Sequence, residues 1–167
     1  MLFRSGLHHL ERDFLQSGLN RGKLKLGLFE YSDTALRNTS ISSYFQNSMR
    51  LLDQNVMDSL FRPEAPVYTK VRDEIPSYYG DDAQLSDCLV ADGCAILGRA
   101  EQSILFRAVY IEKGAYVKNS IIMQGSRIGE GAILENVILD KGVTVSPYIH
   151  LCSTGQHPIT LHKGETI

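Results

Sequence analysis

Tryptophan, cysteine and long hydrophobic runs are scarce or absent in this sequence. There is no Trp, and the three cysteines, Cys88, Cys94 and Cys152, lack the spacing of a zinc site. A small, odd number of cysteines is typical of reduced thiols rather than a disulfide framework. No run approaches the roughly 18 apolar residues of a transmembrane helix, and the first residues lack the apolar stretch of a signal peptide. We therefore expect a cytoplasmic protein with no membrane partner.

The sequence also lacks a large excess of positive or of negative charge. The chain of 167 residues has 17 Lys and Arg against 19 Asp and Glu, a net charge of −2. Nucleic-acid-binding proteins usually carry a basic surplus, so we expect no nucleic-acid partner. Because 43% of the residues are hydrophobic, disorder is excluded and a sizeable core is expected.

The first half of the chain has mixed periodicity. A short helix is expected around Leu10 and Phe14, and the alternation over Lys23–Tyr31 predicts a half-buried strand. From Ile41 to Leu60, apolar residues recur every three or four positions, which predicts one long amphipathic helix capped by Thr39 or Ser40.

A single strand and a single helix cannot close a core. Residues 1–80 are therefore predicted to be the tail of a domain that lies mostly outside this chain, together with a helical linker. A small α+β layer that belongs wholly to this chain is the alternative.

The second half of the chain has a different period. Aliphatic or small residues recur in steps of mostly five or six, and three consecutive steps sum to 17. They are Leu85, Val90, Ile96, Ala100, Leu105, Ile111, Val117, Ile122, Ile128, Leu134, Leu139 and Val145. Neither a helix nor an ordinary strand has this period, whereas a chain that winds around a triangular prism does.

Residues 81–167 are accordingly predicted to form a parallel β-helix of hexapeptide repeats, with about four coils. Each coil buries its aliphatic residues only against its neighbours, so stability comes from stacking. Pro147, Gly155 and Pro158 interrupt the period, which predicts a loop between residues 146 and 160 before a last edge strand over Leu161–Ile167.

Several short sequence segments resemble those of a known protein family. They are Ile41-Ser42-Ser43-Tyr44-Phe45-Gln46-Asn47, Pro66-Val67-Tyr68-Thr69-Lys70, Leu89-Val90-Ala91-Asp92-Gly93-Cys94, Ser103-Ile104-Leu105-Phe106-Arg107 and Asn119-Ser120-Ile121-Ile122-Met123-Gln124. Over roughly residues 24–167 the sequence resembles the C-terminal part of bacterial glucose-1-phosphate adenylyltransferase (ADP-glucose pyrophosphorylase), most closely its D-type regulatory subunit.

The resemblance implies a left-handed β-helix that follows an α/β nucleotidyltransferase domain. The complete enzymes convert ATP and glucose 1-phosphate to ADP-glucose and pyrophosphate in glycogen biosynthesis, with Mg²⁺. Their Gly-rich nucleotide-binding loop has no counterpart in this chain, so the chain by itself is expected to be inactive and to hold no cofactor. The implied partners are a catalytic subunit of the same enzyme or further copies of this chain, and a sugar-phosphate effector.

Arg37 departs from the family pattern. Catalytic members of the family carry a metal-binding Asp four residues before the Ile that opens the long helix, here Ile41. A guanidinium has no lone pair to offer Mg²⁺, so no metal site is expected in this chain. The change agrees with the regulatory role that the resemblance implies.

Four basic residues are candidates for an effector or anion site near the junction of the two halves, because Arg and Lys are the usual partners of phosphate. They are Lys70, Arg72, Arg107 and Lys118. The alternative is ordinary surface charge balanced by nearby Asp and Glu residues. No catalytic residue is predicted.

A free-standing hexapeptide-repeat acyltransferase that uses acetyl-CoA is the alternative function. Such enzymes use a histidine within the coils as the base, but here the coils from Ala100 to Val145 contain none. His150, His157 and His162 all lie in the irregular terminal segment, which argues against this alternative.

Overall fold

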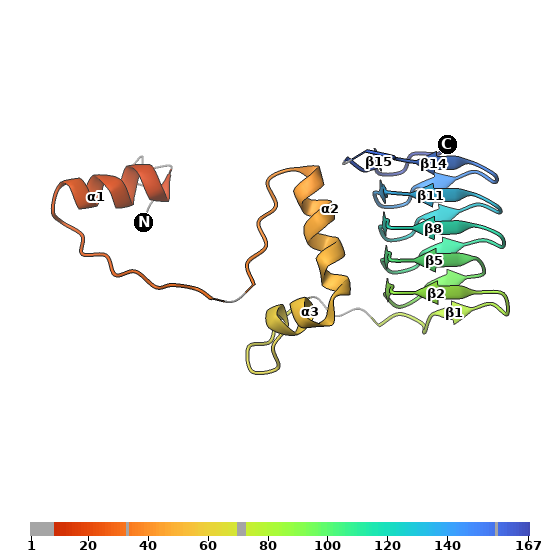
Figure 1. Cartoon of the computed structure of the whole chain (residues 1–167), viewed down its shortest axis with the longest axis horizontal. Coiled ribbons are helices and arrows are strands. Elements are labelled where there is room, and N and C mark those ends of the chain that lie inside the picture. The colour runs from red at the N-terminus through yellow and green to blue at the C-terminus, as the bar shows by residue number, and fades with distance from the viewer. Residues whose placement is uncertain (1–8, 33, 70–72, 156) are drawn as a thin grey trace. The chain divides into compact units, whose positions relative to one another are not determined.

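The computed structural model describes residues 9–32, 34–69, 73–155 and 157–167, and these fall into two compact units, Met1–Asp33 and Thr34–Ile167. In the first unit a π-helical stretch, Leu10–Gln16, leads into the short helix α1, Ser17–Asn20. The chain then runs on without regular structure to residue 32 (Figure 1).

The strand predicted over Lys23–Tyr31 is wrong, because no residue from 23 to 32 is in a strand. A strand needs a neighbour for its backbone N–H and C=O groups, and none of the described strands pairs with this segment. Most of its apolar side chains are consequently exposed, with Leu28 at 107% and Phe29 at 86% of full exposure, while Leu24 is half-buried.

The predicted long helix is present as two helices. Helix α2, Ile41–Met49, begins with a capping box in which Ser40 accepts from Ser43 N, as the sequence predicts. A 3₁₀ turn, Arg50–Leu52, follows, and α3 spans Gln54–Leu60. The break falls at Asp53, whose side chain accepts from Asn55 N at 2.9 Å and so starts a new helix.

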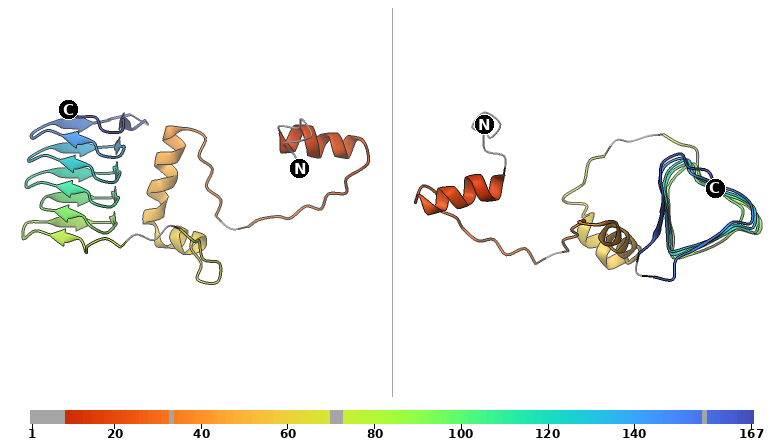
Figure 2. Two further views of the ribbon diagram at one scale, coloured as in Figure 1. Left: turned by 180° about the vertical axis from the view of Figure 1, so that it is seen from behind. Right: turned by 90° about the horizontal axis from the view of Figure 1, so that it is seen from above.

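The predicted parallel β-helix of hexapeptide repeats is confirmed. Among the described residues, fifteen short strands form three parallel sheets of five strands each, which stack as the predicted coils (Figure 1). Seen end-on, the coils superimpose as a triangle (Figure 2).

Each sheet takes one strand from every coil. Sheet A contains β1 (Tyr78–Tyr79), β4 (Ala95–Ile96), β7 (Tyr110–Ile111), β10 (Arg127–Ile128) and β13 (Thr144–Val145). Sheet B contains β2 (Gln84–Ser86), β5 (Arg99–Glu101), β8 (Tyr116–Lys118), β11 (Ile133–Glu135) and β14 (His150–Cys152). Sheet C contains β3 (Leu89–Val90), β6 (Ile104–Leu105), β9 (Ile121–Ile122), β12 (Val137–Leu139) and β15 (Ile159–Leu161).

The core lies along the axis of the prism. Ten of the twelve periodic residues, from Ile96 to Val145, are at most 2% exposed. The other two, Leu85 and Val90, belong to the first coil and are half-buried. The sequence period therefore identified the inward-facing side chains correctly.

Buried serines connect successive coils where sheet B turns into sheet C. Ser103 Oγ accepts from Ser120 N at 3.2 Å, and Ser120 Oγ accepts from Val137 N at 3.1 Å. Each hydroxyl also donates to a carbonyl two residues earlier in its own coil. These bonds satisfy backbone groups that the turn leaves without ladder partners.

One coil is two residues shorter than those above it. Only residues 97 and 98 separate β4 from β5, whereas four residues separate the corresponding strands of the other coils. Gly98 makes the short turn possible: a Cβ there would lie 2.4 Å from Ala115 O and 2.6 Å from Glu112 O.

The terminal loop is shorter than predicted. Within residues 146–160 the structure contains the regular strand β14 and two of the three residues of β15, and between them the described residues 153–155 and 157–158 are in no strand. The segment after β15 contributes one bridge, Thr144 to Thr166, and Ile167 packs on the core. Leu151 continues the 17-residue period from Leu134, its ladder partner, which is why β14 forms.

Helix α2 covers part of the outer face of sheet C. Phe45 is 9% exposed and packs against Ile121 and Ile138, with Tyr44 and Met49 around it. The helix and the β-helix therefore share a small second apolar cluster outside the prism.

Candidate functional site

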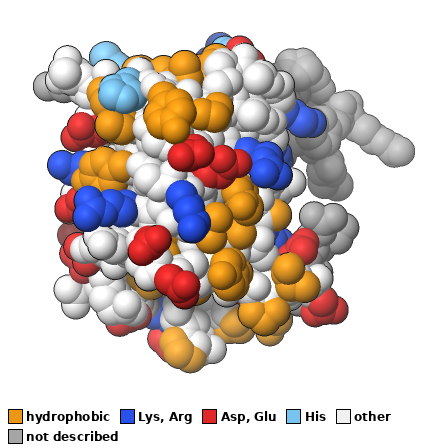
Figure 3. Space-filling view, turned by 90° about the vertical axis from the view of Figure 1, so that its right-hand side faces the viewer, with side chains coloured by type: hydrophobic (Ala, Val, Ile, Leu, Met, Phe, Trp, Pro, Cys, Tyr) orange, Lys and Arg blue, Asp and Glu red, His pale blue; other side chains and the backbone are white. Residues whose placement is uncertain are grey.

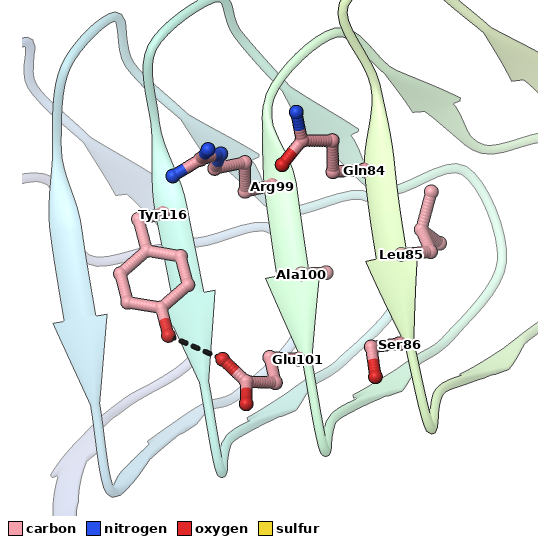
Figure 4. Close-up of a pocket in the computed structure, with 7 residues that line it drawn as sticks. All are labelled: Gln84, Leu85, Ser86, Arg99, Ala100, Glu101 and Tyr116. Carbon is pink, nitrogen blue, oxygen red and sulfur yellow. Dashed lines mark hydrogen bonds between the residues drawn. The ribbon is translucent and has the colours of Figure 1, made fainter.

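A shallow hollow of about 360 Å³ lies on the outer face of sheet B, over β2, β5 and β8. Its polar lining consists of Gln84, Ser86, Arg99, Glu101 and Tyr116 (Figure 4). Strand alternation places these side chains outward, while the intervening Leu85 and Ala100 belong to the core. The register sets Gln84 beside Arg99 and Arg99 beside Tyr116, so three neighbouring coils contribute.

A hydrogen bond fixes one wall of the hollow. Tyr116 OH donates to Glu101 Oε2 at 2.6 Å, and Figure 4 shows the phenol tilted toward that carboxylate. This bond, which favours the neutral phenol, raises the pKa of Tyr116 above its usual value. The ring is thereby held in one orientation.

Two side-chain donors in the hollow have no hydrogen-bond partner in the part of the chain that the structure describes. Among the described residues, the side chains of Arg99 and Gln84 make no hydrogen bond or ion pair, and both side chains are on the exposed side of the sheet. The guanidinium of Arg99 and the carboxylate of Glu101 carry opposite charges, so the hollow has no net charge. It offers free donors, a carboxylate and an aromatic ring to a polar ligand.

Two of the four predicted effector residues, Arg107 and Lys118, lie in the described part of the chain, at different corners of the prism. Lys118 lies at the end of β8, where its Nζ is 3.6 Å from Glu135 Oε1. Arg107 lies in the turn after β6, across sheet C from that corner. Lys70 and Arg72 lie outside the described residues, so the predicted effector site stays a prediction.

The three terminal histidines are separated from one another. His150 stands on the outer face of β14, opposite Ile133 in the ladder. His157 Nδ1 lies 2.6 Å from Ser42 Oγ, a contact between the loop after β14 and the first turn of α2. The backbone N of His162 donates to Glu165 Oε2 at 2.7 Å. The Ser42 contact spans 115 residues of sequence, and no local pattern could predict it.

Arg37 lies exposed in the segment before α2, and its carbonyl accepts from Asn47 Nδ2 at 3.0 Å. Within the described ranges no three His, Cys, Asp or Glu side chains are close enough to hold a metal ion. The guanidinium of Arg37 itself has no lone pair to offer a metal ion.

The cysteines are free thiols with different access to solvent: Cys94 is buried, Cys88 half-buried and Cys152 exposed. Burial raises the pKa of the Cys88 and Cys94 thiols. Neither is therefore an activated nucleophile.

The outer surface carries charges of both signs. Figure 3 shows acidic, basic and apolar side chains interspersed on one face of the molecule, without a large patch of one charge. On sheet A, Arg127 lies over the Tyr110 ring at 4.6 Å and 3.7 Å from Glu112 Oε1.

Sequence reasoning missed the residues of the hollow. The 17-residue period could have revealed part of them, since Arg99 and Tyr116 are 17 apart and therefore adjacent on the same face. Gln84 could not be found in this way, because the shorter coil places it only 15 positions before its ladder partner Arg99.

Several known proteins and one family model are similar to this chain in sequence. Residues 75–156 match the family model described as "GlmU-like, C-terminal hexapeptide". The chain is similar to the glycogen biosynthesis protein GlgD. It is 42% identical to that protein from Bacillus subtilis over 136 residues, which are 81% of this chain and 40% of the relative. The identity with GlgD from Geobacillus stearothermophilus is 46% over 118 residues, which are 71% of this chain and 34% of the relative.

A more distant similarity connects the chain with glucose-1-phosphate adenylyltransferases. The enzyme from Bacillus thuringiensis is 27% identical over 134 residues, covering 80% of this chain and 35% of the enzyme. The chain thus spans well under half the length of the relatives it matches. The predicted resemblance is confirmed at this level: a hexapeptide β-helix related to glycogen biosynthesis proteins.

The helices in the described ranges are all too short or too polar to cross a membrane.

Proposed function

We propose that this chain is the assembly and regulatory β-helix part of a GlgD-type subunit, which acts in the cytoplasm beside a catalytic glucose-1-phosphate adenylyltransferase subunit. The observation that carries the proposal is the difference in identity. The chain shares 42–46% of aligned residues with two GlgD proteins but 27–28% with the adenylyltransferases. Arg37, in place of the family's metal-binding Asp, also supports a regulatory rather than a catalytic role for this subunit.

The first coil is the proposed assembly surface, and the adenylyltransferase subunit is its proposed occupant. Within the part of the chain that the structure describes, strands β1, β2 and β3 each have one edge that pairs with no strand, and a hollow of about 580 Å³ opens between Tyr79, Leu85 and Val90. Exposed strand edges with apolar residues beside them favour pairing with another chain. The opposite end is better covered, since Thr166 bridges to Thr144 and Ile167 packs on the core.

In this proposal Mg²⁺ and ATP belong to the complete enzyme, and a sugar-phosphate effector acts on the assembly. Lys70, Arg72, Arg107 and Lys118 remain the candidate effector residues. Of the two that lie in the described ranges, Lys118 is the less available, because it already faces Glu135.

The acyltransferase alternative has one observation in its favour. The hydroxyl of Ser42 and the imidazole of His157 are within hydrogen-bonding distance, as in a nucleophile–base pair. However, no described carboxylate is bonded to His157, and a base needs such an orienting group. The predicted acetyl-CoA activity therefore ranks second.

The experiment that tests the proposal is an activity assay in two steps. Alone, with Mg²⁺, ATP and glucose 1-phosphate, the chain should release no pyrophosphate. Added in equimolar amount to the adenylyltransferase from the same organism, it should change the KM for ATP or the response to a sugar phosphate. Pyrophosphate release by the chain alone would contradict the proposal, as would unchanged kinetics of the mixture. Acetyl transfer from acetyl-CoA to a sugar acceptor would establish the alternative.

A further inference from the structure

The hollow on sheet B has the composition of a site for a neutral, hydroxyl-rich molecule. Its lining contains an amide, a hydroxyl, a guanidinium and a carboxylate around one aromatic ring. A phosphorylated ligand or a nucleic acid would be favoured by a net positive charge, which Glu101 removes by facing the same space as Arg99. The chemistry therefore favours a ligand that both donates and accepts hydrogen bonds and carries no charge.

Tyr116 adds a constraint on shape. Its phenol is tethered to Glu101 Oε2 at 2.6 Å, so the ring is an ordered platform beside the free donors of Arg99 (Figure 4). A pyranose ring has an apolar face of C–H groups that packs on an aromatic ring, and a rim of hydroxyls that reaches polar side chains. At about 360 Å³ the hollow has room for one or two such rings.

The regular spacing of the coils suits a repeating ligand. Neighbouring parallel strands are about 4.8 Å apart, and Gln84, Arg99 and Tyr116 occupy successive strands in register. Successive sugar units of an oligosaccharide repeat at a similar distance, so side chains on adjacent coils can contact adjacent units.

We propose that the hollow lined by Gln84, Ser86, Arg99, Glu101 and Tyr116 binds a neutral oligosaccharide. Tyr116 packs against the apolar face of one sugar ring, Arg99 and Gln84 donate to ring hydroxyls, and Glu101 accepts from one. The choice of glucose as the sugar rests on the proposed function in glycogen biosynthesis, whereas the saccharide class rests on the hollow alone. Nothing in this proposal requires the chain to associate with another subunit.

The test is a titration of the isotopically labelled 167-residue chain with maltotriose, followed by amide NMR shifts. Binding is expected in the millimolar range, with saturable shifts at the amides of β2, β5 and β8. Tyr116→Ala should weaken binding by at least about fivefold, because the ring contact is lost. Tyr116→Phe keeps the ring and should retain most of the affinity, and Arg99→Gln should weaken binding about threefold or more.

Arg127→Gln is the matched control, since Arg127 also lies beside a tyrosine but on sheet A. It should bind maltotriose like the unchanged chain. Circular dichroism establishes that each variant is folded. Glucose 1-phosphate and inorganic phosphate are titrated in parallel to separate saccharide from anion binding.

Three results would overturn the proposal. They are the absence of saturable shifts with maltotriose, equal weakening by Arg127→Gln and Arg99→Gln, and shifts with inorganic phosphate but none with maltotriose. The association test of the proposed function uses a different readout, so failure of one leaves the other standing.

Discussion

Single residues at the corners decide how closely the coils stack. Gly98 and Gly129 both sit where a Cβ would overlap the backbone of the next coil. At Gly129 the nearest atom would be Pro147 N, at 2.6 Å. Neither contact can be relieved by rotating a side chain, because the opposing atoms are main-chain atoms. These glycines are required by packing between coils.

Replacing Gly98 by Ala should therefore lower the free energy of unfolding by about 1–3 kcal/mol, since the coil above must shift. Urea denaturation followed by circular dichroism measures the change. Gly155→Ala is the control, because its Cβ would meet nothing closer than 4.0 Å. Equal stability of the two variants would show that the short corner tolerates a side chain.

The phenol of Tyr116 provides a second test at the residue scale. Its hydrogen bond to Glu101 raises its pKa, so it should ionise above the usual tyrosine value of about 10. The hydrogen bond stabilises the fold while the phenol is protonated. Its contribution to stability is lost as the pH rises through the raised pKa of Tyr116.

The absorbance difference between the unchanged chain and Tyr116→Phe isolates this titration, since no tryptophan contributes. Glu101→Gln should move the midpoint back toward lower pH. A midpoint at or below the ordinary value in the unchanged chain would mean that the Tyr116–Glu101 bond is absent in solution.

Among the elements, α2 is attached to the prism by few side chains. Phe45 is its only buried residue, and it packs on Ile121 and Ile138 of sheet C. The core inside the prism is a separate cluster that does not include Phe45. The helix can therefore separate from the prism without opening the coils.

Phe45→Ala should speed hydrogen exchange of the α2 amides by tenfold or more, a loss of about 1.4 kcal/mol or more in docking energy. The amides of β8 to β12 should remain protected. Gln46→Ala, on the exposed side of the same helix, should leave both regions unchanged. Loss of protection throughout the prism would show that α2 is part of the same folding unit.

The elements also show how far the sequence could be interpreted. The period of aliphatic residues predicted the prism and its inward side chains, because stacking demands one apolar position for each side of each coil. Asp53 ended the helix early through a local cap, which the apolar pattern of Ile41–Leu60 did not reveal. The strand predicted over Lys23–Tyr31 is absent. Alternating apolar residues form a strand only when a neighbouring strand pairs with them, and no sheet in the described residues includes this segment.

The candidate site was not predictable in the same way. Its residues come from neighbouring strands whose paired positions are 15 and 17 residues apart. They can be recognised as neighbours only when the register of each coil is known. The predicted anion residues were chosen for their charge and their place near the junction of the two halves of the sequence. Lys118 turned out to face Glu135, and Arg107 lies at another corner.

At the scale of the whole molecule, the prism has one open and one covered end. The open first coil, with Tyr79, Leu85 and Val90 around its hollow, is the surface proposed to contact an adenylyltransferase subunit. The hollow places Leu85 and Val90 beside the carboxylate of Asp87, so a further negative charge at Tyr79 should abolish the association by leaving an unpaired charge in the interface.

Sedimentation velocity of the chain mixed with the adenylyltransferase from the same organism tests this account most directly. The account predicts a faster boundary that contains both proteins. That boundary should disappear with Tyr79→Asp but persist with Tyr68→Asp, a change at a residue that is 92% exposed in the linker. Two independent boundaries for the unchanged proteins at micromolar concentration, or a complex indifferent to Tyr79→Asp, would contradict it.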